Sequence, residues 1–258
     1  MKLQNQTAIV TGAARGIGKE IALSLAREGA DVLLASRDKE ALEHVAHNIR
    51  DMGRRALVVR TDVSDEQQVA AMANSALAEF RRIDILVNNS GVVGPTIPLA
   101  KLSREEWDQV IAVNLTGAFL CSRAVIPQMI SQASGCIINI ASIAGKLAYA
   151  LRSPYAVSKW GMLGLSRTLA QELGPHNIRV NAICPGPTAG ERMQGVIAGR
   201  AKELGRPVEE VERTYLEGTA LKRMVDPTHV AAAVVFLASK EGSSITGEAI
   251  DISCGFAL

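Results

Sequence analysis

The chain of 258 residues is close to the roughly 250 that one α/β domain reaches without splitting, so length alone leaves one or two domains open. Nearly half of the residues (48%) are apolar and only 3% are aromatic, which suits a buried parallel sheet built from Ala, Val, Ile and Leu. The formal net charge is +2 and no run of like charges occurs. This composition excludes a nucleic-acid-binding or polybasic membrane surface and favours a small-molecule partner.

The four cysteines, Cys121, Cys136, Cys184 and Cys254, are widely spaced and have no partners at metal-ligand spacing. We therefore predict reduced core thiols and no metal site. The first residues lack the basic and apolar regions of a signal peptide, and no apolar run reaches the roughly 18 residues of a membrane span. These features predict a cytoplasmic protein.

Short runs rich in Val, Ile and Leu alternate with helical periodicities along the chain. Strands are expected at Thr7–Val10, Asp31–Ala35, Ala56–Arg60, Asp84–Val87, Cys136–Ile140, Arg179–Ile183 and Ala249–Ile252. Helices are expected at Lys19–Glu28, Glu40–Met52, Glu66–Phe80 and Tyr155–Leu173, among others. The alternation predicts an α/β fold of Rossmann type, a doubly wound parallel sheet of about seven strands with helices on both faces. We find no linker or repeat, so residues 1–258 are expected to form a single domain.

A glycine-rich turn, Thr11-Gly12-Ala13-Ala14-Arg15-Gly16-Ile17-Gly18, follows the first strand and runs into a helix. Gly12 allows a tight turn, Gly16 lets the backbone approach a pyrophosphate, and Gly18 lets helix and strand pack closely. The phosphates are expected at the positive end of the helix. A glycine-rich turn alone also serves plain loops, but its position between the first strand and first helix predicts a dinucleotide site.

The second strand ends in Ser36-Arg37-Asp38, where a dinucleotide fold meets the adenosine ribose. Arginine accommodates a 2′-phosphate, whereas an acidic residue binds a 2′-hydroxyl. Arg37 comes first, Arg15 is a possible second cation and Ser36 a hydroxyl donor, so we predict NADP. Asp38 keeps NAD as the alternative, because a shift of one residue would bring its carboxylate to the ribose.

The alternation of strands and helices breaks between Ile183 and Thr228. The long segment there includes a charged helical piece, Glu191–Leu216, and a loop of this length is usually functional. We predict a substrate lid near residues 187–216, with a surface helical hairpin as the alternative. Arg192 could hold an oxygen-rich or anionic substrate, whereas Met193, Val196 and Ile197 could favour a hydrophobic ketone, and the sequence does not rank the two.

The glycine turn, Asn88-Asn89-Ser90-Gly91, Ser142 and Tyr155-x-x-x-Lys159 together resemble the shorter branch of the short-chain dehydrogenase/reductase family. The resemblance spans almost the whole chain and includes Asp62, Asn114, Pro185-Gly186 and Thr246-Gly247. It implies a nicotinamide cofactor, homotetrameric assembly, and a catalytic set of Asn114, Ser142, Tyr155 and Lys159. It also implies that Asp62 and Val63 border the adenine and that Asn88 and Gly91 lie along the cofactor.

One departure from the family concerns the loop after the sixth strand. Gly190 stands where relatives often have a phosphate-binding Thr, so Thr188 is the candidate to replace it. The complete set of predicted cofactor contacts is Gly12, Arg15, Gly16, Ile17, Gly18, Ser36, Arg37, Asp62, Val63, Asn89, Gly91, Tyr155, Lys159, Pro185, Gly186 and Thr188.

A phenol is a poor acid or base near neutrality, so it needs a neighbouring positive charge that stabilises the phenolate. Lys159 lies one helical turn after Tyr155, and Ser153 as N-cap with Pro154 at the first position would place Tyr155 in the positive first turn. Ser142 follows a strand and can donate to a substrate oxygen, while the resemblance gives Asn114 a bound water that links Lys159 to solvent.

The function predicted from these residues is transfer of hydride between nicotinamide and a ketone or secondary alcohol, with Tyr155 as acid/base. The Tyr-x-x-x-Lys spacing differs from that of relatives that reduce C=C bonds. A catalytically idle NADP-binding redox sensor or scaffold is the alternative, although such a protein would be free to lose Ser142, Tyr155 or Lys159. A sugar epimerase of the longer branch is disfavoured because no separate substrate domain follows.

Overall fold

The computed structural model describes residues 1–256 and contains one parallel sheet with strand order β3-β2-β1-β4-β5-β6-β7. Its strands are β1 (Thr7–Thr11), β2 (Asp31–Ser36), β3 (Ala56–Arg60), β4 (Ile85–Asn88), β5 (Gly135–Ile140), β6 (Ile178–Pro185) and β7 (Ala249–Ile252). The predicted Rossmann-type fold is confirmed, and each predicted strand is present within two residues at either end. The strand order reverses between β1 and β4, which is where doubly wound sheets bind their ligands.

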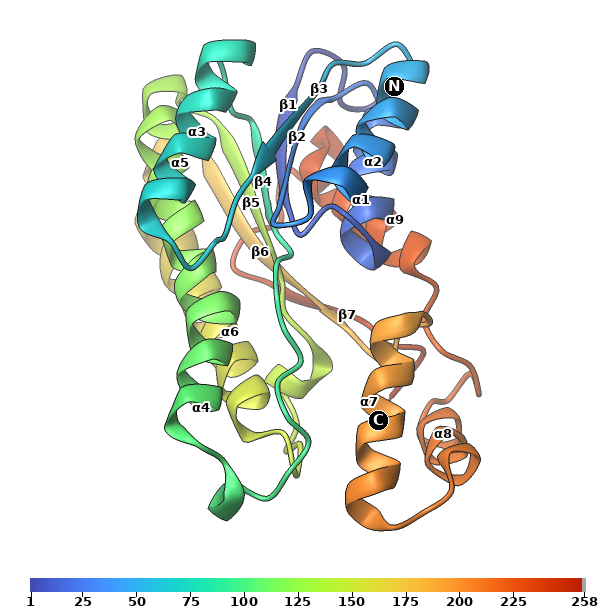
Figure 1. Cartoon of the computed structure of the whole chain (residues 1–258). Helices are drawn as coiled ribbons and strands as arrows, with labels where there is room; N and C mark the ends of the chain where they lie inside the picture. Colours follow the sequence, from blue (N-terminus) through green and yellow to red (C-terminus); the bar gives the residue numbers. More distant parts are fainter. Residues whose placement is uncertain (257–258) are drawn as a thin grey trace.

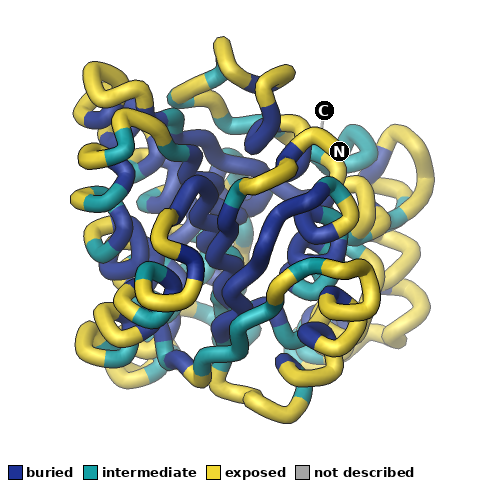
Figure 2. Tube along the Cα trace, turned by 90° about the horizontal axis from the view of Figure 1, so that it is seen from above, coloured by how far each residue is buried: buried dark blue, intermediate teal, exposed yellow. Residues whose placement is uncertain are grey.

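Helices cover both faces of this sheet (Figure 1). One face carries α1 (Gly16–Arg27), α2 (Lys39–Asp51) and α9 (Pro227–Ala238), whose apolar residues share one core cluster. The other face carries α3 (Glu66–Phe80), α5 (Gly117–Gln132) and α6 (Ser153–Leu173), which form a second cluster. The central strands are buried between these layers, while exposure is concentrated in the outer helices and loops (Figure 2). This burial explains the continuous apolar runs that predicted the strands.

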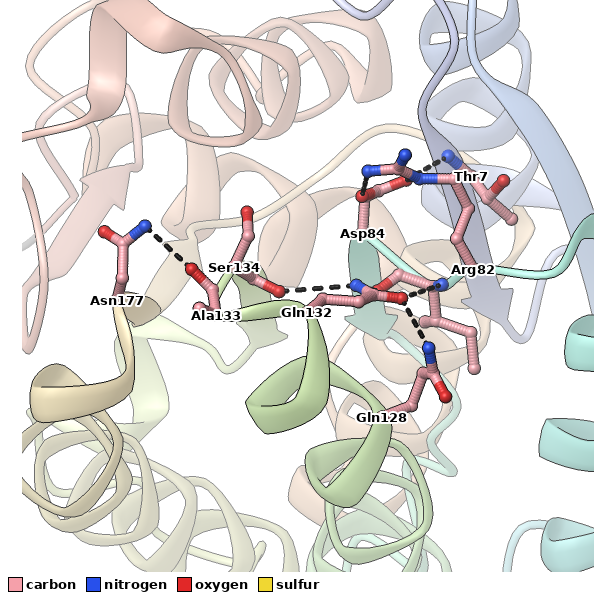
Figure 3. A network of polar contacts seen from close by, with 9 residues as sticks. Thr7, Arg82, Asp84, Gln128, Gln132, Ala133, Ser134 and Asn177 are labelled. Carbon is pink, nitrogen blue, oxygen red and sulfur yellow. Dashed lines mark hydrogen bonds and ion pairs between the residues drawn. The ribbon is translucent and has the colours of Figure 1, made fainter.

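The amino edge of the sheet is held by polar side chains that join β1, β4 and the end of α5 (Figure 3). The Asp84 carboxylate accepts hydrogen bonds from Thr7 N at 2.8 Å and from the Arg82 guanidinium at 2.6 and 2.8 Å. Gln132 bonds both the N–H and the carbonyl of Ile83. The network provides hydrogen-bond partners for backbone groups at the amino ends of the strands, opposite the carboxyl ends where the strand order reverses.

One continuous helical run, Arg104–Gln132, consists of α4 (Arg104–Ile111), a π turn (Ala112–Thr116) and α5. By length and composition it could cross a membrane, a test that buried core helices also pass. Its α5 part packs against β4, β5 and α3, which accounts for its apolar character. The π turn inserts Asn114 within this run, and such turns are frequent at functional sites.

The segment after β6 folds into two helices, α7 (Glu191–Leu204) and α8 (Val208–Glu217), which lie side by side beyond the helical layers (Figure 1). The helical piece predicted over Glu191–Leu216 is therefore a hairpin that turns at Gly205, whose φ of 63° suits glycine. Met193, Val196 and Ile197 point into a small core of their own, together with Val211 and Tyr215. These apolar residues therefore stabilise the hairpin.

Candidate active site

A cleft of about 1680 Å³ opens at the carboxyl ends of the strands, where the strand order reverses. It exceeds the roughly 300–1,000 Å³ of typical small-ligand pockets, so it has room for a dinucleotide and a substrate together. All sixteen predicted cofactor contacts line it: Gly12, Arg15, Gly16, Ile17, Gly18, Ser36, Arg37, Asp62, Val63, Asn89, Gly91, Tyr155, Lys159, Pro185, Gly186 and Thr188. Ser142 lines it as well, and Asn114 lies behind its wall.

The glycine turn between β1 and α1 forms a cradle for a ligand, and side chains at the glycine positions would occupy that space. Gly12 has a φ of 65°, and a Cβ at Gly18 would lie 2.2 Å from the Gly12 carbonyl oxygen. Asn89 fixes the turn, because its Nδ2 donates to the carbonyls of Thr11 (3.0 Å) and Gly12 (3.1 Å). No side chain caps the start of α1 and no acidic residue occupies its first turn, so its N–H groups remain free for an anion. The cradle therefore fits a pyrophosphate.

Arg37 and Asp38, which follow β2 where the adenosine ribose was predicted to bind, have different surroundings. Arg37 is largely exposed, and its nearest acidic partner is Asp62 at 3.8 Å. Asp38 instead caps α2, since its carboxylate accepts from Ala41 N at 3.1 Å. The Ser36 hydroxyl donates to the Asp38 carbonyl at 3.2 Å. Hydrogen bonds from Ser64, aided by the Arg37 charge, hold the pKa of the Asp62 carboxyl below its usual value.

Ser142 and Tyr155 reach the cleft from two different elements. Ser142 ends the β5 segment and caps a short 3-10 helix, where its Oγ accepts from Ala144 N at 3.1 Å. Because this bond uses an oxygen lone pair, the hydroxyl proton is free to donate to a substrate oxygen. Tyr155 lies half-buried in the first turn of α6. The arrangement brings a hydrogen-bond donor and a phenol to the same wall of the cleft.

Lys159 lies one turn after Tyr155, with its Nζ 5.8 Å from the centre of the Tyr155 ring. The side chain is buried, and Nζ donates to the Ile140 carbonyl at 2.7 Å. Burial, together with a smaller contribution from the positive charge of Arg192, lowers the pKa of Lys159 to about 7. This buried amine can therefore exchange a proton near neutral pH.

Asn114 holds the loop after β4 against α6. In the π turn its Oδ1 accepts from Val92 N at 2.7 Å, and its Nδ2 donates to the Val92 carbonyl at 3.0 Å and to Ser158 Oγ at 3.1 Å. Asn114 is fully buried. Its side chain therefore fixes the loop that carries Gly91 and the helix that carries Lys159. The predicted bound water remains a prediction.

Two predictions at the level of single residues are wrong. Asn88 is buried away from the cleft, where its Nδ2 donates to Asn139 Oδ1 at 2.8 Å and links β4 to β5. Ser153 is not the N-cap of α6; Arg152 occupies that position, and no side chain caps the helix. Of the cysteines, Cys254 is only partly buried, whereas the other three are buried free thiols.

Thr188, the predicted replacement for the threonine that relatives often have at position 190, lines the cleft. Its hydroxyl, however, donates to the Gly186 carbonyl at 3.0 Å. Gly190 follows with a φ of 132°, a conformation that side chains rarely adopt, directly before α7 begins. The oxygen of the Thr188 hydroxyl can still accept a hydrogen bond, and donation to a phosphate would require the hydroxyl to rotate.

Sequence reasoning missed a cluster of aromatic and basic side chains at the substrate end of the cleft. Tyr149, Arg152, Arg200 and Tyr215 line it together. They come from the loop before α6 and from the α7–α8 hairpin. The one signal in the sequence was the position of Arg152, three residues before Tyr155. Among residues 1–256, no group of three or more His, Cys, Asp or Glu side chains is arranged to hold a metal ion.

Comparison with known proteins agrees with this fold and site. The family model described as short chain dehydrogenase matches residues 6–200. The 3-oxoacyl-(acyl-carrier-protein) reductase FabG of Staphylococcus epidermidis is 36% identical, covering 97% of this chain and 98% of the relative. The cis-4-hydroxycyclohexanecarboxylate dehydrogenase of Sinomonas cyclohexanicum is 38% identical over 97% and 96% of the two chains. The crystal structure of an NAD⁺-bound xylitol dehydrogenase superposes with a TM-score of 0.96 at 32% identity, over 99% and 100% of the chains.

Together with these relatives, the fold and the cleft place the protein among the oxidoreductases of a family that uses nicotinamide cofactors. The chain belongs to the short-chain dehydrogenase family. The relatives named above include a reductase and dehydrogenases, and one neighbour is described with NAD⁺ bound.

Proposed function

We propose that this protein is an NADP-dependent oxidoreductase that interconverts a ketone and a secondary alcohol, with Tyr155 as the acid/base. The observation that carries the proposal is the convergence of Ser142, Tyr155 and Lys159 on one wall of the cleft, beside the glycine cradle. No single residue of this set is specific by itself. Their joint placement at the switch point is what supports oxidoreductase chemistry over an idle sensor.

The nicotinamide, when bound, supplies or accepts the hydride. In the reducing direction the Ser142 hydroxyl donates a hydrogen bond to the carbonyl oxygen and stabilises the negative charge that develops there. The Tyr155 hydroxyl then delivers its proton to that oxygen. A protonated Lys159 stabilises the resulting phenolate from the same helical face. Oxidation of the alcohol runs through the same residues in reverse.

Three finer features belong to the same proposal. NADP is favoured because Arg37 is free at the ribose end while Asp38 is engaged as a helix cap. The substrate lid predicted near residues 187–216 corresponds to the α7–α8 hairpin, which lines the cleft beyond β6. The protein works in the cytoplasm as a homotetramer, and exposed apolar side chains on α5 and α6, including Phe119, Val157 and Trp160, suit such an assembly.

Initial-rate measurements on the purified protein test this function. Reduced nicotinamide absorbance is followed with NADPH or NADH against ketones, oxo-acids and oxo-sugars, and with the oxidised cofactors against the matching alcohols. We expect turnover with NADPH, reduced at least about 100-fold in Tyr155→Phe, the scale of a lost general acid. Tyr155→Phe activity equal to wild type would refute the assigned chemistry. Turnover with NADH alone would keep the chemistry and overturn the cofactor preference.

A further inference from the structure

Arg152 is a buried cation whose hydrogen-bonding capacity is mostly unused. The residue is 1% exposed, and it is the largest of the fully buried side chains. Its Nη2 donates to the Val93 carbonyl at 2.6 Å, whereas Nε and Nη1 have no hydrogen-bond partner among residues 1–256. A buried charge with unpaired donors is costly, and native proteins normally pair it. Arg152 nevertheless lines the cleft, which indicates that a ligand provides the missing partner.

The surroundings of Arg152 add positive charge and hydroxyl groups. Its guanidinium carbon lies 5.6 Å from the centre of the Tyr149 ring, and that of Arg200 lies 5.5 Å from the same ring. The hydroxyls of Tyr149 and Tyr215 are 2.8 Å apart, and Arg200 Nη1 lies 3.4 Å from the Tyr215 hydroxyl. Burial raises the pKa of Tyr149, so this phenol stays neutral and can donate to an anion.

Nearby acidic side chains already have partners or lie elsewhere. Described ion pairs around the hairpin join Glu203 to Lys101 and Glu210 to Arg206. Glu106, which lines the cleft, is engaged with Ser103 in the capping box of α4. Glu191, the other acidic residue at this end, is exposed in the first turn of α7. Within residues 1–256, neither Arg152 nor Arg200 forms an ion pair with a carboxylate.

We propose that Arg152, with Arg200 and the Tyr149 hydroxyl, binds the carboxylate of the substrate, so that the enzyme acts on an oxo- or hydroxy-carboxylic acid. This inference rests on the proposed oxidoreductase function. An arginine edge that presents two N–H donors matches a carboxylate in bidentate geometry. Such an edge consists of Nη2 with either Nε or Nη1. Nε and Nη1 are closed to solvent and have no partner among the described residues, and Nη2 keeps a second N–H beside its bond to Val93, so one complete edge is left for a carboxylate. A bound carboxylate therefore requires the side chains packed around Arg152 to move apart, and Tyr149, whose ring lies beside the guanidinium, belongs to the cleft wall.

The position of Arg152 also limits the length of the substrate. Its guanidinium carbon lies 5.0 Å from the centre of the Tyr155 ring, so the acid group and the reacting carbonyl are separated by only a few bonds. Arg192, the residue predicted for this role, also lines the cleft, but its guanidinium is engaged with the Gly91 carbonyl. The anion site therefore lies deeper than the lid surface and next to the phenol.

Paired substrates test the proposal on the wild-type protein. Oxo-acids of increasing chain length and 4-oxocyclohexanecarboxylate are each compared with their methyl esters, which keep the carbon skeleton and remove the charge. We expect kcat/KM for at least one acid to exceed that of its ester by about tenfold or more, the value of a charge-assisted hydrogen bond. The difference is expected in KM, because the carboxylate binds equally in ground and transition states.

Variants then assign the preference to Arg152. Arg152→Gln is expected to collapse the ratio of acid to ester, Arg152→Lys to restore part of it, and Arg200→Gln to reduce it. Arg213→Gln removes an exposed arginine of α8 outside the cleft lining and should leave the ratio unchanged. A purely structural Arg152 would instead change acid and ester kinetics by the same factor, and that result would overturn the proposal.

Equilibrium titration of the acids and esters into the protein saturated with NADPH separates this inference from the proposed function. Binding of an acid that depends on Arg152, without turnover, would support the anion site and refute the oxidoreductase activity. Turnover of esters and acids with equal kcat/KM would support the oxidoreductase activity and refute the anion site. Failure of every acid to bind more tightly than its ester would overturn the anion site.

Discussion

Lys159 is the residue whose environment changes its chemistry most clearly. Its amine is buried beside the Tyr155 ring, and burial lowers the pKa to about 7 from an ordinary 10.5. Above pH 7 the folded protein therefore holds Lys159 neutral, whereas the unfolded chain keeps its proton up to the ordinary pKa. Since the unfolded state binds more protons in this window, stability rises with pH from about 7 toward 10.5, and the penalty is fully present below pH 7.

The first prediction follows from this rise of stability with pH. Between pH 7 and 9, the cofactor-free wild-type protein should gain about 2 kcal/mol of unfolding free energy relative to Lys159→Met, since one pKa unit corresponds to about 1.4 kcal/mol. Urea unfolding at the two pH values measures the difference. Parallel pH dependences of wild type and variant would show that Lys159 is not the titrating group.

Arg37 carries the prediction about the cofactor. Its guanidinium is 61% exposed and has only a distant ion pair with Asp62, so it is free for a 2′-phosphate. Arg37→Gln should raise the Michaelis constant for NADPH by about tenfold and change that for NADH by less than about twofold, because only NADPH carries the extra charge. Steady-state kinetics with both cofactors measure it. Arg50→Gln, an exposed arginine at the far end of α2, is the control, and an equal effect on both cofactors would contradict the assignment.

At the scale of elements, the two ends of the sheet have different roles. The carboxyl end opens at the glycine turn and carries the cleft, whereas the amino end is closed by the network around Asp84 and Gln132 (Figure 3). Binding therefore depends on free backbone donors at one end, and stability depends on satisfied donors at the other. Mutations at the two ends should separate activity from stability.

Asp84→Ala tests this separation. The substitution leaves the buried Thr7 N–H without its acceptor, a loss worth about 1–3 kcal/mol of unfolding free energy. Denaturant unfolding measures the change, and kcat/KM should stay within about twofold because Asp84 lies far from the cleft lining. Asp108→Ala, which removes the exposed pair with Arg104, should cost at most about 0.5 kcal/mol. Equal costs for the two substitutions would contradict the account.

At the scale of the whole molecule, the outer surface of α5 and α6 carries large apolar side chains that are exposed in the single subunit. Phe119 on α5 and Val157 and Trp160 on α6 are between 42% and 53% exposed, and both helices cover the same face of the sheet (Figure 1). Large apolar side chains of this kind commonly mark an interface between subunits. The surface is thus the basis for the proposed tetramer.

Trp160→Glu should dissociate the assembly, because a charge replaces an exposed indole within the proposed contact. Size-exclusion chromatography with light scattering is expected to show a tetramer for wild type and smaller species for the variant. Leu221→Glu, on an exposed loop outside α5 and α6, should keep the wild-type mass. A monomeric wild-type protein would refute the proposed tetramer.

The sequence by itself determined the parallel sheet, the glycine turn and the catalytic pair, because hydrophobic periodicity, glycine positions and helical spacing are local properties. Gly12, Gly18 and the Tyr155–Lys159 pair were identified in this way, and the structure brings them to one place. The start of α6 and the role of Asn88 were wrong. The role of Asn88 depends on a neighbour distant in sequence, the Asn139 amide that pairs with it.

Only the tertiary structure decided what surrounds the reacting groups. Arg152 and Arg200 are separated by 48 positions in the sequence, and each alone resembles an ordinary surface charge. Folding buries the first against Tyr155 and brings the second to Tyr149. The burial that leaves Arg152 short of partners, and Lys159 with a pKa near neutrality, is a property of packing between distant segments. Local sequence patterns do not encode such burial, because the cost of desolvating a charge depends on everything that encloses it.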